Sequence, residues 1–220
     1  MPSPRRKRQS GGGANSIRRL GPGRWYYVDS SSGREVEIYG RVRGKFPASM
    51  MNRKDEFWTL PVRKSRSQLD TICRSGVSPT YIVSAVKSAS YLLLSAGPTK
   101  KAKKKGGGGQ SELASFAIIK DRKPEMYIDV ICAERGSRYG KPMMRAVENF
   151  ARYKRGFRRI ALSSLPSAVS FYVMLGFVES DDPCSADPKI RKAGSVADGY
   201  RMKLCICSPS QRQRQRGHRK

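Results

Sequence analysis

The residues with the clearest chemistry lie in the turn Glu134–Gly140 (ERGSRYG), between an apolar strand-like segment and an amphipathic helical one. A strand that enters a helix through a glycine-containing turn directs several backbone N–H groups outward, and the helix dipole adds about half a positive charge there. Gly140 lets a ligand approach the backbone closely, and Arg135, Arg138 and Lys141 add cationic side chains. The turn predicts an anion cradle suited to a pyrophosphate, although junctions of this kind also occur without a ligand.

A second segment, Leu162–Phe177 (LSSLPSAVSFYVMLGF), contains the end of a strand, a short helix with the pattern A-x-x-F-Y, and then L-G-F. The pattern residues are Ala168, Phe171, Tyr172, Leu175, Gly176 and Phe177. This segment resembles the closing motif of the GNAT superfamily of N-acetyltransferases, and R-G-S-R-Y-G upstream resembles that superfamily's R/Q-x-x-G-x-G/A motif. The resemblance covers about Phe57–Cys207 and is strongest over Ile128–Phe177.

The resemblance implies a site for acetyl-CoA and direct transfer of an acetyl group to an amine, on a protein or a polyamine. It implies that cofactor contacts come from Ile131, Cys132, Ala133, Arg135, Arg138, Tyr139, Gly140, Lys141 and Phe171. The backbone of Ile131–Ala133 would hold the pantetheine arm, and Arg138–Lys141 the pyrophosphate. Tyr172 would be the acid that protonates the departing thiolate, because a phenol with a pKa of about 10 suits that role; the alternative for Tyr172 is an aromatic side chain packed beside Phe171.

Two positions depart from the superfamily pattern. Arg138 stands where the first glycine is expected, and Leu165 stands where an asparagine is often found before the last helix. No general base is evident. Asp129 is a catalytic candidate because it lies on the strand that often carries one, but a solvent-facing strand residue fits the sequence equally well.

Alternating and helical patterns place these residues on a mixed sheet of the α/β (α+β) class, mostly antiparallel, with helices on both faces. Strands are expected at Trp25–Val28, Glu35–Tyr39, Phe57–Val62, Tyr91–Leu94, Leu113–Lys120, Met126–Ala133, Arg159–Leu162 and Tyr200–Ile206. Helices are expected at Ser67–Cys73, Pro79–Lys87, Lys141–Arg155 and Pro166–Leu175. The predicted domains are a disordered basic arm (1–24), a β-hairpin extension (25–47), an acyltransferase domain (55–208) with a flexible Lys/Gly loop (98–111), and a basic tail (209–220).

The charge of the chain suggests a second class of function. The formal net charge is +28 in 220 residues, which predicts attraction to polyanions. The alternative to an enzyme is therefore a basic nucleic-acid- or ribosome-binding protein on a catalytically degenerate GNAT scaffold. The two functions are compatible, since basic tails can bring an enzyme to nucleic acid, but tails that only confer solubility also fit.

Cysteine usage and the absence of apolar runs indicate an intracellular protein of the cytoplasm or nucleus. The five cysteines form no C-x-x-C pair and His218 is the single histidine, so no metal site is expected. We expect reduced thiols in a reducing compartment. No apolar run is long enough to cross a membrane, and the N-terminus has no hydrophobic segment typical of a secretory signal. The basic run Arg5–Arg8 is compatible with nuclear import, and an organelle transit peptide is the alternative.

The acceptor amine and the oligomeric state are not evident from the sequence. In the GNAT superfamily variable loops form the acceptor pocket, which corresponds here to Ser65–Ser78 and Glu179–Asp198. The second loop carries Asp181, Asp182 and Asp187, which could attract a cationic amine or form an ordinary acidic loop.

Overall fold

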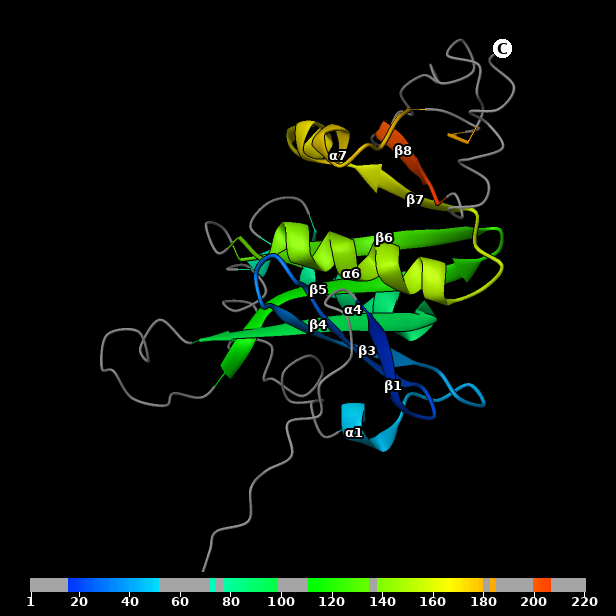
Figure 1. Cartoon of the computed structure of the whole chain (residues 1–220). Coiled ribbons are helices and arrows are strands. Elements are labelled where there is room, and N and C mark those ends of the chain that lie inside the picture. Colours follow the sequence, from blue (N-terminus) through cyan, green and yellow to red (C-terminus); the bar gives the residue numbers. More distant parts are fainter. Residues whose placement is uncertain are drawn as a thin grey trace, which may run out of the picture.

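A computed structural model describes residues 16–51, 72–73, 77–98, 111–134, 138–179, 183–184 and 200–206, and the structural statements below concern these residues. They form an eight-stranded sheet whose spatial order follows the sequence (Figure 1). The strands are β1 (Ile17–Gly21), β2 (Arg24–Val28), β3 (Glu35–Gly40), β4 (Tyr91–Pro98), β5 (Ser111–Arg122), β6 (Glu125–Ala133), β7 (Arg159–Ser164) and β8 (Tyr200–Cys205). Neighbouring strands pair antiparallel except β6 and β7, which are parallel. The predicted mixed, mostly antiparallel sheet is confirmed.

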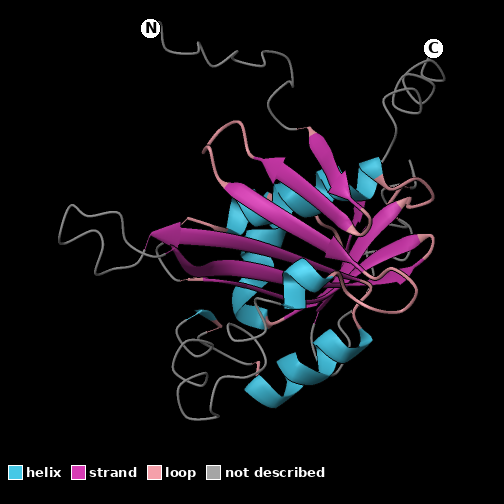
Figure 2. Cartoon of the chain, turned by 90° about the horizontal axis from the view of Figure 1, so that it is seen from below, coloured by secondary structure: helices cyan, strands magenta, loops and turns pink. Residues whose placement is uncertain are grey.

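Helices cover both faces of this sheet, as expected (Figure 2). The described helices are α1 (Ala48–Met51), α4 (Pro79–Ser88), α6 (Gly140–Tyr153) and α7 (Val169–Met174), the last preceded by a 3-10 turn, η1 (Pro166–Ala168). Helix α6 buries Met143, Val147 and Phe150 in the same core as Ile128 of β6 and Tyr172 of α7. Residues of α4 form a second core with the opposite face of β4, β5 and β6. The spacing of apolar residues along α6 explains why one stripe of this helix is buried.

The Trp25–Tyr39 hairpin, which we expected as an extension of the domain, is continuous with the main sheet. Strand β3 pairs with β4 from Glu37 opposite Leu94 to Gly40 opposite Tyr91. The expected strand Phe57–Val62, most of the helix Ser67–Cys73, residues 99–110 of the Lys/Gly loop and the tail 209–220 lie outside the described residues. Of the basic arm that we expected to be disordered (1–24), residues 1–15 also lie outside them. Ile17–Gly21 of this arm form β1, so the prediction of disorder was wrong there, because the backbone of these residues pairs with β2. The hairpin therefore supplies β2 and β3, which lie between β1 at the edge of the sheet and β4.

Asp29 fastens the turn of this hairpin to α6. Its carboxylate is fully buried and lies 3.2 Å from Nη1 of Arg145, and it accepts hydrogen bonds from the hydroxyls of Ser31 and Ser32. Burial acts to raise the pKa of Asp29, but the hydrogen bonds from Ser32, Ser31 and Arg145 and the charge of Arg145 outweigh it and lower the pKa below its ordinary value. The turn is thus held by a charged group that is stabilised in its ionised form.

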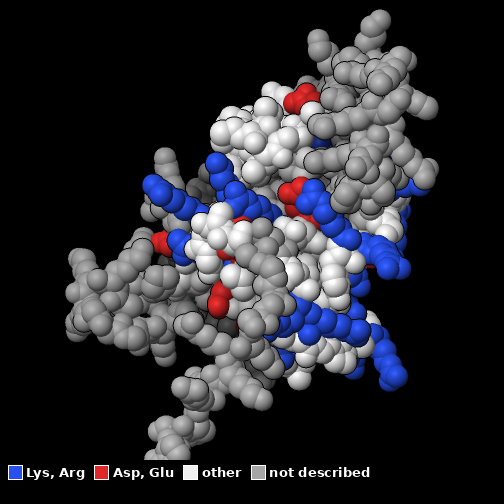
Figure 3. Space-filling view, in the orientation of Figure 1, with Lys and Arg blue, Asp and Glu red and all other residues white. Residues whose placement is uncertain are grey.

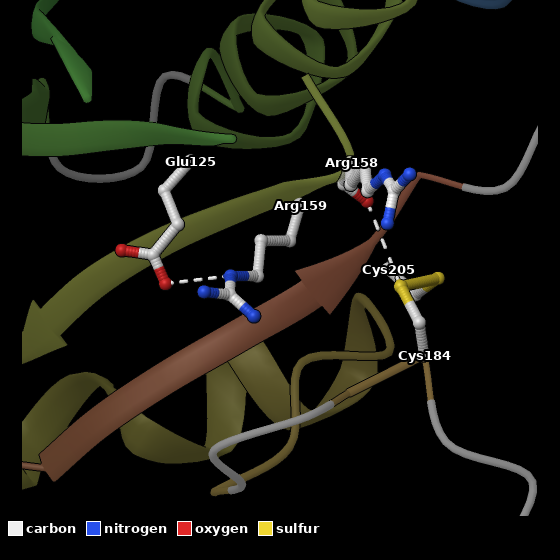
Figure 4. The surroundings of a disulfide bond; sticks show 5 residues. All are labelled: Glu125, Arg158, Arg159, Cys184 and Cys205. Carbon is white, nitrogen blue, oxygen red and sulfur yellow. Dashed lines mark hydrogen bonds and ion pairs between the residues drawn. A yellow bond between two sulfur atoms is a disulfide. The ribbon is translucent and has the colours of Figure 1, made fainter. Parts of the chain in front are cut away.

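The cysteines differ from the prediction. Cys73 forms a disulfide with Cys132, and Cys184 forms one with Cys205 (Figure 4). The expectation of reduced thiols was wrong for these four residues, because partners that are 59 and 21 residues apart cannot be recognised from spacing alone. Near the second disulfide, Arg159 Nε lies 2.7 Å from a carboxylate oxygen of Glu125, so an ion pair ties β7 to β6 where their parallel pairing begins (Figure 4).

The described residues contain neither a candidate membrane-spanning helix nor a candidate metal-binding group. No described helix is both long and apolar enough to span a bilayer. Within the same part of the chain, no group of three His, Cys, Asp or Glu side chains is placed to hold a metal ion.

Candidate active site

Strands β6 and β7 part at a bulge in β6. Ile118 of β5 pairs with Val130, but the next residue, Ile119, pairs with Ile128, so Asp129 is an extra residue in β6. The parallel pairing of β6 with β7 ends at the same point, at Ile128 opposite Leu162. Both strands continue, to Ala133 and Ser164, without further pairing to each other (Figure 1).

The parted stretch of β6 presents backbone groups on the side away from β5. The N–H of Glu134 donates to the carbonyl oxygen of Ala114 at 2.9 Å, so the backbone of residue 134 faces β5. Because the direction alternates along a strand, the backbone of Cys132 also faces β5, while the N–H and C=O groups of Ile131 and Ala133 face the side where β7 has diverged. A strand edge of this kind can pair with an extended ligand that carries amide groups.

This geometry divides the three residues that we expected to hold pantetheine. Ile131 and Ala133 are half-buried and have the required backbone orientation. The backbone of Cys132 faces its partner Phe116 on β5, and its sulfur is bonded to Cys73. Cys132 therefore contributes to the site by fixing β6 rather than by offering free backbone groups.

Among the described residues, no side chain at the N-cap position satisfies the first turn of α6. The helix begins at Gly140, and the preceding residue, Tyr139, makes no capping hydrogen bond with its side chain. Backbone N–H groups of a first helical turn have no partner within the helix and attract anions. Arg138, in the left-handed region with φ of 57°, and Lys141 are exposed beside this terminus. The anion cradle stays a prediction, with Arg138, Gly140 and Lys141 at this terminus and Arg135 outside the described residues.

Tyr139 turns its side chain away from this cradle. It is 4% exposed, and the guanidinium of Arg34 lies 3.7 Å from its ring centroid. Its hydroxyl points at β4, where a Cβ added to Gly97 would lie 2.5 Å from the hydroxyl oxygen. Of the contacts predicted for Tyr139, only those of its backbone remain open to a ligand.

The two sequence motifs meet at Gly140 and Phe171. A Cβ added at Gly140 would lie 3.4 Å from Cζ of Phe171, so α7 packs directly against the first turn of α6. The half-buried ring of Phe171 makes an edge contact with the ring of Tyr172, which in turn contacts Phe177. The fold thus brings together segments that are 31 positions apart in the sequence.

The side chain of Tyr172 is almost buried, at 7% exposed. This burial bears on both roles predicted for Tyr172, the acid that protonates the thiolate and the aromatic ring packed beside Phe171. Burial raises the pKa of Tyr172 to about 12. Its ring belongs to the core beneath α6, as the packing alternative expected. At neutral pH its hydroxyl therefore keeps its proton and can act only as a donor toward an anion.

Asp129 lies at the bulge and is already paired. Its carboxylate is 2.6 Å from Nζ of Lys120 and accepts a hydrogen bond from the hydroxyl of Tyr81 at 3.0 Å. Its side chain is 4% exposed, so the solvent-facing alternative does not apply. Burial, then the hydrogen bond and charge of Asp129, raise the pKa of Tyr81.

Lys120 and Tyr81 were missed by the sequence analysis. Tyr81 lies on α4, 48 residues before Asp129, and no spacing signal connects them. Lys120 pairs with Tyr127 across the β5–β6 hairpin, but its approach to Asp129 depends on the bulge. Most of the two segments expected to form the acceptor pocket, including Asp181, Asp182 and Asp187, lies outside the described residues.

The chain is similar to known proteins in structure but not in sequence. No protein-family profile matches the chain, and no curated protein sequence matches it. Among solved structures, the chain is similar to Tetrahymena GCN5, with a TM-score of 0.44, 13% identity, and coverage of 73% of this chain and 88% of that one. It is also similar to the ribosomal-protein-S18-alanine N-acetyltransferase from Escherichia coli (TM-score 0.42, 16% identity, coverage 79% and 95%).

A third similar structure is PaiA N-acetyltransferase from Thermoplasma acidophilum in complex with coenzyme A (TM-score 0.40, 13% identity, coverage 77% and 98%). The second and third structures are described as N-acetyltransferases. TM-scores below 0.5 do not by themselves establish a shared activity. The geometry of β6, α6 and α7 is what bears on function.

Proposed function

We propose that this chain is an acetyl-CoA-dependent N-acetyltransferase that transfers an acetyl group directly to an amine. The observation that carries the proposal is the parting of β6 from β7 after Ile128, beside the N-terminus of α6, which the side chain of its N-cap residue Tyr139 does not cap. One side of this opening offers backbone amides for an extended arm, and its end offers N–H groups for an anion. Coenzyme A has both parts, a pantetheine arm with two amides and a pyrophosphate.

The residues present fit this ligand. The backbone of Ile131 and Ala133 would pair with the pantetheine amides in the manner of an added strand. The N–H groups of Gly140 and Lys141, the helix dipole and the exposed side chains of Arg138 and Lys141 would hold the pyrophosphate. When bound, acetyl-CoA supplies an acetyl group activated as a thioester.

The chain's own groups would manage the protons. The carboxylate of Asp129 is the candidate to accept a proton from the acceptor ammonium, in competition with the ammonium of Lys120 that it already binds. The hydroxyl of Tyr172 is the candidate donor to the departing sulfur. With a pKa of about 12, Tyr172 would lose its proton to a thiolate whose thiol has a pKa of about 8.5 only at a free-energy penalty of about 5 kcal/mol. We therefore assign Tyr172 as a hydrogen-bond donor to sulfur rather than as a full proton donor.

The second candidate is a basic binding protein on a scaffold that has lost catalysis. The burial of Tyr172 and the pairing of Asp129 with Lys120 favour it, because both predicted catalytic groups are engaged by the protein. The two candidates differ in turnover, because only the first produces an acetylated amine.

Calorimetry with the full chain tests the proposal. Acetyl-CoA and CoA should bind, and ligand at about 100 times its Kd should stabilise the protein by about 2.7 kcal/mol. Lys141→Ala should weaken binding, whereas Lys87→Ala, at an exposed position on α4, should not. Incubation with a lysate and labelled acetyl-CoA, followed by mass spectrometry, would identify the acceptor. If neither thioester nor CoA binds at about 1 mM, the upper end of ordinary substrate affinities, the proposed function is wrong.

A further inference from the structure

A cluster of cations lies at the opposite end of α6 from the proposed cofactor cradle. We define the basic corner as Arg19 of β1, Lys123 of the β5–β6 turn, and Lys154 and Arg155 after α6. Figure 3 shows Lys and Arg side chains gathered over β1 and over the end of α6, at the right of the view. Helix α6 has 14 residues, so about 21 Å of helix separates the corner from Gly140.

Arg19, Lys123 and Lys154 are near neighbours, although they come from three parts of the chain, and Arg155 directly follows Lys154. Lys154 has a lowered pKa because of burial and of the charges of Lys123 and Arg19, with Asp121 acting in the opposite direction. A Cβ at Gly156 would lie 3.5 Å from the side chain of Lys123, so the chain after α6 passes beside it. Arg19 is paired with Trp25 across β1 and β2, and the ammonium of Lys154 lies over the ring of Trp25, so these two cations share one face of the sheet.

Asp121 compensates these positive charges only in part. It lies 3.9 Å from Lys123 and also accepts a hydrogen bond from the hydroxyl of Tyr91. Arg19 and Arg155 are exposed, and the side chain of Lys123 is 58% exposed. Three cationic groups at this corner therefore remain open to an external anion.

Aromatic rings accompany the cations. Lys154 Nζ lies 5.0 Å from the ring centroid of Trp25 on β2 and 5.5 Å from that of Tyr91 on β4, which fixes the ammonium over these strands. Tyr153, next to Lys154, is 43% exposed on the last turn of α6. Exposed aromatic rings and cations on one stretch of surface are the combination that binds unpaired bases and their phosphates, and here the ring precedes Lys154 and Arg155 directly in the sequence.

We propose that the basic corner binds the phosphodiester backbone of a single-stranded nucleic acid, with a base stacked on Tyr153. Arg19, Lys123 and Arg155 contact phosphates, and Lys154 adds positive charge from its place over Trp25. The four residues of this site belong to the part of the chain that the structure describes. It is independent of the proposed transferase activity.

Fluorescence anisotropy with the full chain and a labelled single strand of about 12 nucleotides tests this, since that length fits the usual site sizes. The triple variant Arg19→Gln, Lys123→Gln, Arg155→Gln is compared with Arg43→Gln, Lys45→Gln, Lys87→Gln, which removes the same charge from exposed positions elsewhere. Between about 50 and 200 mM salt, the corner variant should lower the slope of log affinity against log salt by about 2, and the matched control should leave it unchanged. Tyr153→Ala should weaken single-strand binding about fivefold or more, with duplex binding retained, and Tyr153→Phe should bind normally.

Equal losses in the two triple variants would overturn the proposal in favour of diffuse charge. Loss of binding to phosphatidylserine vesicles in the corner variant, with oligonucleotide binding intact, would instead assign the corner to a membrane surface. Circular dichroism checks folding, and Arg155→Gln against Arg43→Gln serves as a single-residue comparison if the triple variant unfolds. Calorimetry with acetyl-CoA on the corner variant should be unchanged, which separates failure of this proposal from failure of the transferase proposal.

Discussion

Gly140 and Phe171 are in contact: a Cβ on Gly140 would lie 3.4 Å from Cζ of Phe171. This contact joins the first turn of α6, where we place the pyrophosphate, to the helix that carries Tyr172. A movement of α7 would therefore affect both the pyrophosphate end of the proposed site and the position of Tyr172. The side chains at positions 140 and 171 also limit each other's size.

Enlarging Gly140 should separate α6 from α7. Gly140→Ala should be tolerated, because a contact at 3.4 Å needs only a small shift of the ring. Gly140→Val should destabilise the fold by about 1–3 kcal/mol through overpacking and should weaken acetyl-CoA binding. Thermal unfolding and calorimetry measure the two effects. Adding Phe171→Leu should recover part of the loss, and additive losses in the double variant would refute the coupling.

Tyr172→Phe should lower turnover and leave CoA affinity nearly unchanged, because the ring still fills its place in the core. A fall in kcat of about a hundredfold or more is expected for loss of a donor to the leaving group. Since the pKa of Tyr172 is about 12, the wild-type rate should show no loss from its ionisation below about pH 10. Tyr153→Phe, on the exposed end of α6, is the control. Unaltered kcat in Tyr172→Phe would leave this residue with a packing role alone.

Asp129→Asn should lower kcat more than Tyr81→Phe does, because the amide cannot accept the proton of an ammonium, whereas the variant at Tyr81 removes only one hydrogen bond to the carboxylate. Lys120→Met should lower KM for a cationic acceptor, because it removes the ammonium that lies 2.6 Å from Asp129. Steady-state kinetics with an identified acceptor distinguish these outcomes. A KM that is unchanged or higher in Lys120→Met would contradict competition for Asp129.

Asp29→Asn should destabilise the protein by about 1–3 kcal/mol at neutral pH, because Arg145 and two serines donate to the buried carboxylate. The folded pKa of Asp29 is lowered, so its stabilisation is fully present above the unfolded pKa of about 3.9 and is lost as pH falls through the folded value. Urea unfolding of wild type and variant should therefore show a stability difference that shrinks below about pH 4. A difference that stays constant down to about pH 2 would disprove this linkage.

Cys73→Ser and Cys184→Ser should each lower stability by about 2–4 kcal/mol, since each opens a loop in the unfolded chain. Only Cys73→Ser should also weaken acetyl-CoA binding, because its partner Cys132 lies between Ile131 and Ala133 on the parted strand. Alkylation with and without reduction, read by mass spectrometry, checks that the bonds form. Equal effects of the two variants on binding would argue against a link between the first disulfide and the site.

The sequence by itself determined most of the described elements and predicted where the site would lie. Apolar alternation in Met126–Ala133 and the helical stripe of Lys141–Arg155 identified β6 and α6, because such periodicity is a local property of the chain. The glycine-containing turn before α6 and the F-Y pair of α7 were likewise visible as short motifs.

Only the tertiary structure decided how these elements combine. The bulge at Asp129, the end of pairing at Ile128 and Leu162, and the disulfides depend on contacts between residues far apart in sequence. The inward turn of Tyr139 toward Gly97 and the pairing of Asp129 with Lys120 and Tyr81 have the same origin. Periodicity fixes which face of an element is apolar, but not which distant side chain it meets. Packing between elements sets those partners, and with them the chemistry that each residue can perform.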